Sequence, residues 1–136
     1  MISLNINTNL GLLIMRLGVG GLMLLHGISK IFGGIDAVKH ILESSGIPAF
    51  LAYGVYVGEV IAPIMILIGF RTRLAAAVMA LSCFVAAATY HPGGIFSLNE
   101  TGGWSLELIG LYLIGSMALF FTGAGRYALS SRSIWD

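Results

Sequence analysis

The sequence predicts an all-α integral membrane protein, a four-helix bundle in one domain over residues 1–136. Of its residues, 57% are hydrophobic and only 10% are charged, whereas about 25% are charged in soluble domains. The mean hydropathy is +0.94. Apolar residues gather in four runs, each close to the ~20 residues that cross a ~30 Å hydrocarbon layer. Nineteen glycines fit this class, because small residues let membrane helices approach closely.

The predicted spans are residues 10–31, 50–70, 74–90 and 104–122. Small residues recur every four positions on the second span, at Gly54, Gly58 and Ala62. On the first span, Gly20 and Gly27 lie on one side of the helix. We expect these positions to form close helix–helix contacts.

Basic residues in the connections predict the orientation. Arg71 and Arg73 follow the second span, and Arg126 and Arg132 follow the fourth. The positive-inside rule then places both termini in the cytoplasm.

The first outer connection, residues 34–48, is predicted to contain a short amphipathic helix. Asp36 is a candidate N-cap, and Val38, Ile41 and Leu42 share one face. Gly46 followed by a proline is typical of a helix end. We expect this helix to lie on the outer membrane interface.

Three charged residues, Arg16, Lys30 and Glu59, fall in or at the rim of apolar runs. A charge at membrane depth costs roughly 2.5–3.5 kcal/mol, so such residues normally face a protein interior and pair. Arg16, His26 and Lys30 occupy one sector of about 80° on the first span. Depth counting along the helices leads us to expect an Arg16–Glu59 ion pair. This pair either belongs to a functional site or only holds the two helices together.

Glu59 is also expected at the floor of an outward-facing polar pocket that collects His26, Lys30, His91 and Glu107. Each has a structural alternative. Lys30 can extend to the outer headgroups, Glu107 can stabilise a helix N-terminus, and His91 can simply end the third span. His26 needs a partner in an apolar helix, and an imidazole changes charge near neutral pH. Pro63 leaves the Glu59 carbonyl without its helix hydrogen bond, which predicts either a pocket wall or a plain bend.

Several chemistries are disfavoured. The one cysteine, Cys83, has no partner for a disulfide or a C-x-x-C motif. No metal-ligand spacing is present, so no metal is expected, although haem ligation by His26 and His91 stays open. The sequence has no phosphate-binding glycine loop. A net charge of +1 without a basic cluster gives no reason to expect nucleic acid.

Several of these segments together resemble the DoxX family of small four-helix bacterial membrane proteins. The resemblance covers nearly the whole chain, in order. It rests on Arg16-Leu17-Gly18, His26-Gly27-x-x-Lys30, Gly58-Glu59, Gly69-Phe70-Arg71-Thr72-Arg73, His91-Pro92 and the run from Thr122 to Ser130. One departure is Ser130, where the family pattern commonly has Asp, which puts a cytoplasmic contact in doubt.

The resemblance implies a multi-pass protein of the bacterial inner membrane. Some relatives are subunits of thiosulfate:quinone oxidoreductase, and others are proposed to organise oxidoreductase complexes in oxidative stress defence. We therefore expect a quinone-linked oxidoreductase subunit, with His26 and Lys30 donating to a quinone and Glu59 relaying protons. No covalently bound cofactor is implied, and the electrons would come from a soluble or membrane-bound redox partner.

Two other functions stay open. The chain can be a non-catalytic scaffold for redox-stress enzymes, in which the charges tie helices and the outer loops recruit partners. It can also be a carrier of protons or small molecules, which liposome uptake would test. Membrane lipid is an expected partner in every case, and a homo-oligomer is compatible with the sequence.

Overall fold

The computed structural model describes residues 2–91 and 93–136, and side chains from residue 8 onward. Pro92, from the His91-Pro92 pair, lies outside the described residues. The described chain is helical apart from its loops and one isolated bridge between Leu98 and Trp104. The elements are α1 (Ile2–Gly33), α2 (Asp36–Ser44), η1 (Ala49–Tyr53), α3 (Gly54–Tyr56), η2 (Val57–Ile61), α4 (Ala62–Ile68), α5 (Thr72–Thr89) and α6 (Glu107–Thr122).

Three helical stretches of the described chain are long and apolar enough to cross a membrane, and α6 is a shorter apolar helix of 16 residues. Those stretches are Thr8–Gly33, Ala49–Ile68 and Thr72–Thr89. The all-α fold and the membrane character expected from the sequence are confirmed. The fourth span starts three residues later than predicted, because Trp104 belongs to the preceding loop, where its indole N–H donates to the Ile95 carbonyl.

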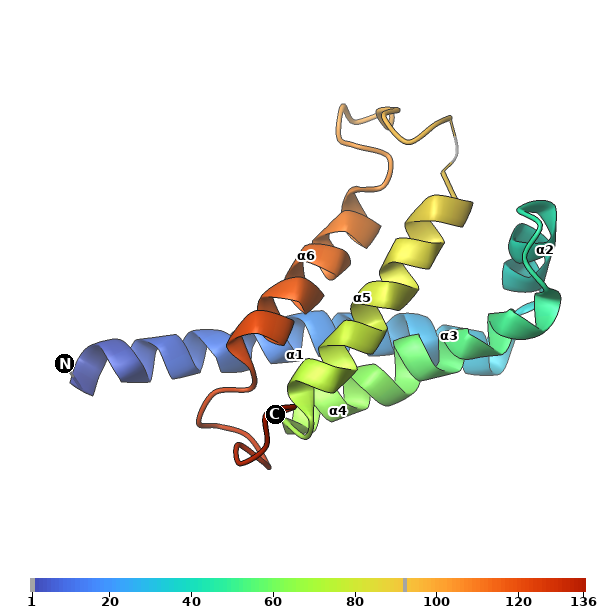
Figure 1. The fold of residues 1–136 in the computed structure, drawn as a ribbon. Helices are drawn as coiled ribbons and strands as arrows, with labels where there is room; N and C mark the ends of the chain where they lie inside the picture. The colour runs from blue at the N-terminus through green and yellow to red at the C-terminus, as the bar shows by residue number, and fades with distance from the viewer. Residues whose placement is uncertain (1, 92) are drawn as a thin grey trace.

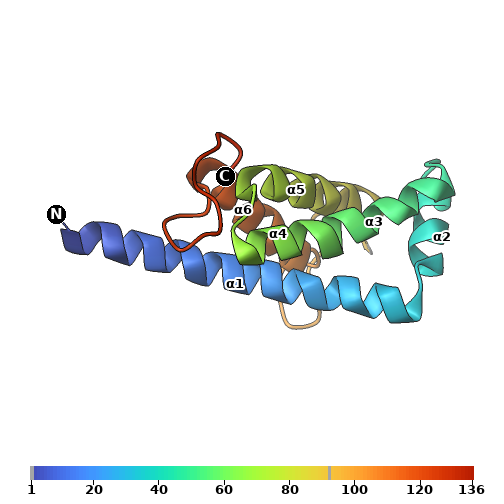
Figure 2. The same ribbon diagram turned by 90° about the horizontal axis from the view of Figure 1, so that it is seen from below.

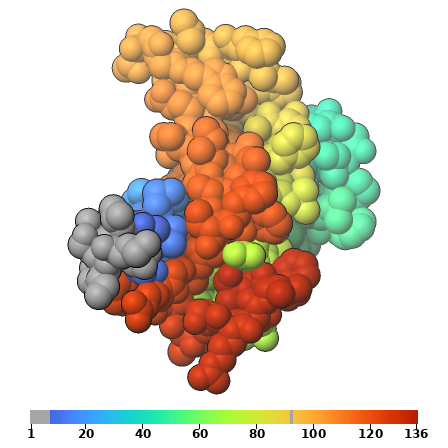
Figure 3. Space-filling model, turned by 60° about the vertical axis from the view of Figure 1, so that its left-hand side comes forward, coloured from blue at the N-terminus to red at the C-terminus, as the bar shows by residue number. Residues whose placement is uncertain are grey.

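The helices form two crossing pairs (Figures 1 and 2). Helix α1 runs beside the continuous η2–α4 segment, and α5 packs along α6. The second pair crosses the first obliquely, so the helices meet closely at one end and separate toward the other (Figure 1). At the close end, residues 123–136 fold beneath α6 and beside α1 (Figure 3).

The main core lies where the two pairs cross. Met23 of α1, Ile66 of α4, Met79 of α5 and Leu119 of α6 are all buried there. Helices can cross this closely because glycines face neighbouring helices. A Cβ on Gly20 would press on Leu67 and Pro63 of α4, and one on Gly58 would collide with Ser82 of α5. The predicted contact positions Gly20, Gly27 and Gly58 are confirmed, whereas Gly54 has open space around it.

The second span is irregular at the turn that contains Glu59. Residues Val57–Ile61 form a π-helical turn in which the Ala62 N–H donates to the Val57 carbonyl, five residues back. Pro63 follows at the start of α4 and has no N–H to give to the Glu59 carbonyl. Prolines and π-turns are both recognised causes of irregularity in a helix, and here the two are adjacent. The expected disturbance by Pro63 is therefore present, as a π-turn.

The predicted amphipathic helix is also present. Leu42 of α2 packs with Ile35 and Ala52 in a second small core, against which Val38 and Tyr56 also pack. The predicted N-cap is wrong by one residue: Asp36 is the first helical residue, Ile35 precedes it, and no side chain caps the turn. Together, α2 and η1 form a cap at the end of α1, seen on the right of Figure 1.

Candidate functional site

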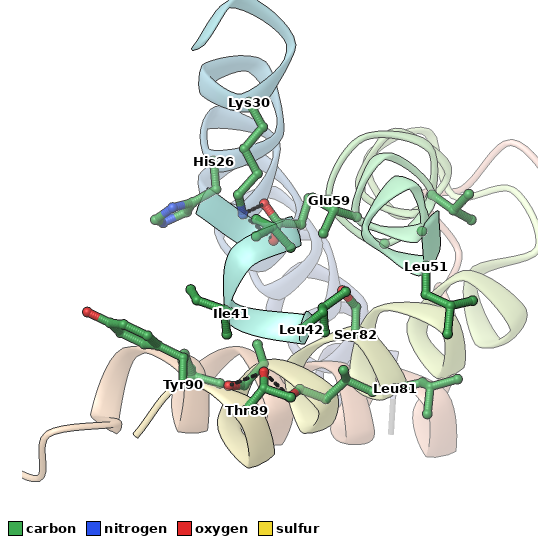
Figure 4. A pocket seen from close by; sticks show the side chains of 18 of the residues that line it. His26, Lys30, Ile41, Leu42, Leu51, Glu59, Leu81, Ser82, Thr89 and Tyr90 are labelled. Carbon is green, nitrogen blue, oxygen red and sulfur yellow. Dashed lines mark hydrogen bonds and ion pairs between the residues drawn. The ribbon is translucent and has the colours of Figure 1, made fainter. Parts of the chain in front are cut away.

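A cavity of about 860 Å³ occupies the space between the two helix pairs and the α2–η1 cap. Most of its wall is aliphatic, from residues such as Ile41, Leu51 and Leu81 (Figure 4). A few polar side chains stand in this wall: His26, Lys30, Glu59, Ser82, Thr89, Tyr90 and Tyr112. An apolar chamber with a few convergent polar groups is the usual form of a small-molecule site.

The Lys30–Glu59 ion pair is the charged feature of this wall. Lys30 Nζ lies 2.6 Å from Glu59 Oε1 and also contacts Oε2, so one ammonium bridges both carboxylate oxygens. The side chains are 28% and 13% exposed. Figure 4 shows Lys30 reaching from α1 to the carboxylate on the neighbouring helix. Each charge is compensated by the other, which is what a low-dielectric wall requires.

His26 projects from the same helix to another side of the cavity (Figure 4). Its ring meets the Tyr112 ring of α6 edge to face, with centroids 5.7 Å apart. Tyr112 is buried, and His26 is exposed. The His26 side chain is therefore held by an aromatic contact on a residue that remains exposed.

The expected Arg16–Glu59 pair is wrong. Arg16 is 1% exposed, and its guanidinium donates to four main-chain carbonyls. Nε donates to Ile66 O (2.8 Å), Nη2 to Leu67 O (2.7 Å), and Nη1 to Ala124 O (3.1 Å) and Tyr127 O (2.5 Å). Ile66 and Leu67 lie in the last turn of α4, where the carbonyls carry the negative end of the helix dipole. The Ile66 carbonyl also accepts from the Gly69 N–H at 3.2 Å, so Arg16 adds a second donor there.

The register of the antiparallel helices explains why Glu59 meets Lys30. Position 20 of α1 faces Pro63 and Leu67, and position 27 faces Glu59. Arg16 is therefore level with the end of α4, eight residues from Glu59, or about 12 Å along a helix. Depth counting failed because the start of the second span packs on α2 in the cap, beyond the end of α1.

Two further candidates lie outside the cavity wall. His91 is exposed in the loop after α5. Glu107 is exposed as the first residue of α6, and the Asn99 side-chain amide donates to it at 3.5 Å. A carboxylate there stabilises the helix N-terminus, which agrees with the structural alternative for Glu107. Three of the six expected residues, His26, Lys30 and Glu59, line one cavity.

Sequence reasoning missed two contributors. Tyr112 packs against His26 and lines the cavity. The sequence pattern that could have indicated it is a tyrosine within the very apolar fourth span. The carbonyls of the 123–127 loop that receive Arg16 had only a glycine-rich pattern as a signal, because a main-chain acceptor has no side chain to recognise.

These features define a small helical membrane protein with an ion pair in an apolar interhelical cavity. Residues 11–92, which carry Arg16, His26, Lys30 and Glu59, match the sequence profile of the DoxX family. The chain belongs to this family. It is also similar to a protein of Bacillus subtilis (strain 168) named "Putative oxidoreductase CatD", with 29% identity over 126 residues, covering 93% of this chain and 89% of that protein. No solved structure matches the chain.

Proposed function

We propose that this protein is a subunit of a quinone-linked oxidoreductase system in the bacterial inner membrane, and that the cavity between the helix pairs holds the quinone headgroup. The observation that carries this proposal is the Lys30–Glu59 ion pair in an otherwise aliphatic wall. Membership of the DoxX family and similarity to a protein named as an oxidoreductase support the reaction class.

The residues present fit a quinone. Its ring needs apolar walls, which Ile41, Leu81 and their neighbours provide. Its two carbonyl oxygens need hydrogen-bond donors, and Lys30 and His26 are available from one helix. Several wall residues, such as Leu51 and Leu81, are exposed on the molecular surface, so a lipid-soluble ligand can enter from the side of the bundle.

A bound quinone supplies the two-electron acceptor and becomes a quinol with two protons. Both electrons come from a partner redox protein, because the single buried cysteine cannot form a dithiol. Lys30 would give one proton to a quinone oxygen, and Glu59, with which it shares a hydrogen bond, would take up a proton from water and return it to Lys30. His26, which is exposed, would give the second proton to the other oxygen and recover one from water, while Tyr112 holds its ring. In the orientation that the positive-inside rule predicts, the arginines of the 71–73 and 126–132 segments lie on the cytoplasmic side.

The experiment is titration of the purified protein with ubiquinone-1 and menadione, read by tryptophan fluorescence. We expect saturable quenching of the fluorescence. Binding should be about tenfold weaker in His26→Ala, which loses a hydrogen bond to the quinone, and in Glu59→Gln, which loses the carboxylate that pairs with the Lys30 donor. The matched controls are Glu43→Gln and His40→Ala, which change the same residue types on α2 outside the cavity wall. Absence of saturable binding, or equal losses in the controls, would overturn the proposal.

A non-catalytic scaffold is the second candidate, and one observation favours it. Lys30 and Glu59 compensate each other's charge, as a purely structural ion pair between α1 and the second span would. Under this proposal, Lys30→Met combined with Glu59→Met preserves partner binding, and changes in residues 36–47 or in the 93–106 loop abolish it.

A further inference from the structure

A second hollow, of about 520 Å³, lies at the opposite end of the molecule from the α2–η1 cap. It is framed by the start of α5, the end of α6, Asn9 of α1 and the 123–136 segment. Figure 3 shows this segment beneath α6. Three arginines line the hollow: Arg73, Arg126 and Arg132.

None of these guanidinium groups has a carboxylate partner among the described side chains, whose ion pairs are Lys30–Glu59, Lys39–Asp36 and Arg71–Asp136. Asp136 is the acidic residue in the wall, and its oxygens are already occupied. They accept from the Ser130 hydroxyl at 2.7 Å, the Arg132 and Ser133 N–H groups, and Arg71. The hollow therefore carries a surplus of positive charge.

One hydrogen-bond donor in this wall is also buried without an acceptor. Arg73 Nε is shielded from solvent and has no hydrogen-bond partner among the described atoms. A buried charged donor without an acceptor is costly, and native structures normally satisfy it. Gly123 lies beside both Arg73 Nε and the Asp136 main chain, and neither Gly123 nor Asp136 supplies that acceptor.

We propose that this hollow binds a phosphate group, carried by an anionic phospholipid or present as free phosphate. Guanidinium forks match phosphate oxygens in geometry and charge. The hollow lies where α5 begins and α6 ends, the level at which the ends of membrane helices meet lipid headgroups. The bound phosphate neutralises the surplus charge and accepts from Arg73 together with Arg126 and Arg132.

The test uses the full chain in dodecyl maltoside, free of phospholipid, with inorganic phosphate added at constant ionic strength against chloride. We expect a saturable rise in the unfolding temperature. Arg126→Gln and Arg132→Gln, both at exposed positions, should each weaken the apparent affinity about tenfold. Lys39→Gln removes the same charge at the other end of the molecule and should have no effect.

A second arm distinguishes the two sources. In nanodiscs of phosphatidylglycerol or phosphatidylcholine, native mass spectrometry measures which lipid stays bound to the wild type and to the Arg126→Gln/Arg132→Gln variant. Selective retention of phosphatidylglycerol that the variant loses supports the lipid, and saturable stabilisation by phosphate alone supports the free anion. If neither ligand binds saturably, or if Lys39→Gln weakens binding as much as the arginine variants, the proposal is wrong.

Discussion

The Lys30–Glu59 pair gives the sharpest test of the site. Lys30 Nζ lies 2.6 Å from Glu59 Oε1, and the side chains are 28% and 13% exposed. Removing one partner from a fully buried pair costs about 3–5 kcal/mol. Because this pair is partly solvated, we expect each single variant, Glu59→Met, Glu59→Gln or Lys30→Met, to lower the free energy of unfolding by about 1–3 kcal/mol.

The double variant Lys30→Met/Glu59→Met leaves no lone charge. Replacement of both members of a buried pair by apolar residues is often nearly neutral, so this variant should be more stable than the sum of the single changes predicts. We expect a coupling energy of about 1–3 kcal/mol. The assay is reversible unfolding in mixed detergent micelles, analysed as a double-mutant cycle.

Glu43→Gln is the matched control, because Glu43 is an exposed glutamate on α2. It should change the free energy of unfolding by less than about 0.5 kcal/mol. Additive single effects in the cycle, or a loss in Glu43→Gln as large as in Glu59→Gln, would refute the assignment of this pair as a coupled unit inside the cavity.

Three further outcomes are expected. Gly27→Ala should destabilise the protein by about 1–3 kcal/mol, since the new methyl group would collide with the Glu59 carbonyl; thermal unfolding measures this. Arg16→Lys should cost about 3 kcal/mol or more, because an ammonium cannot reach the four carbonyls that the guanidinium fork satisfies; chemical unfolding measures the loss. The Ser130 hydroxyl, with main-chain N–H groups, lowers the pKa of Asp136 below its ordinary value of 3.8, against an opposing effect of burial. Its contribution to stability is therefore present above pH 3.8 and is lost as the pH falls through the lower folded-state pKa; unfolding temperatures against pH measure it.

Each of these has its own control. Gly33→Ala, at a position with open space, should not destabilise the fold as Gly27→Ala does. An Arg16→Lys variant as stable as the wild type would show that the guanidinium hydrogen bonds to the four carbonyls do not stabilise the fold. Asp136→Asn should flatten the acid limb of the stability profile, and an unchanged limb would contradict the role of Asp136.

Most of the fold could be predicted because its causes are local. Apolar runs specify the spans, the alternation of Val38, Ile41 and Leu42 with charged residues specifies α2, and the glycines at 20, 27 and 58 mark close contacts that the structure confirms. The Ser130 position shows the limit. As a departure from the family pattern it put a contact in doubt, yet its hydroxyl donates to Asp136, a partner that sequence spacing did not indicate.

Composition and residue order alone establish a helical membrane protein whose few ionisable side chains must be compensated inside the bundle, because hydrocarbon cannot solvate them. Which group compensates which charge was decided only by tertiary structure. A helix advances just 1.5 Å per residue, so the length taken up by the α2–η1 cap moved Glu59 to the level of Lys30. Arg16 lies beside the carbonyls at the end of α4. Because every residue has such an acceptor, no pattern of side chains could predict which carbonyls Arg16 would contact.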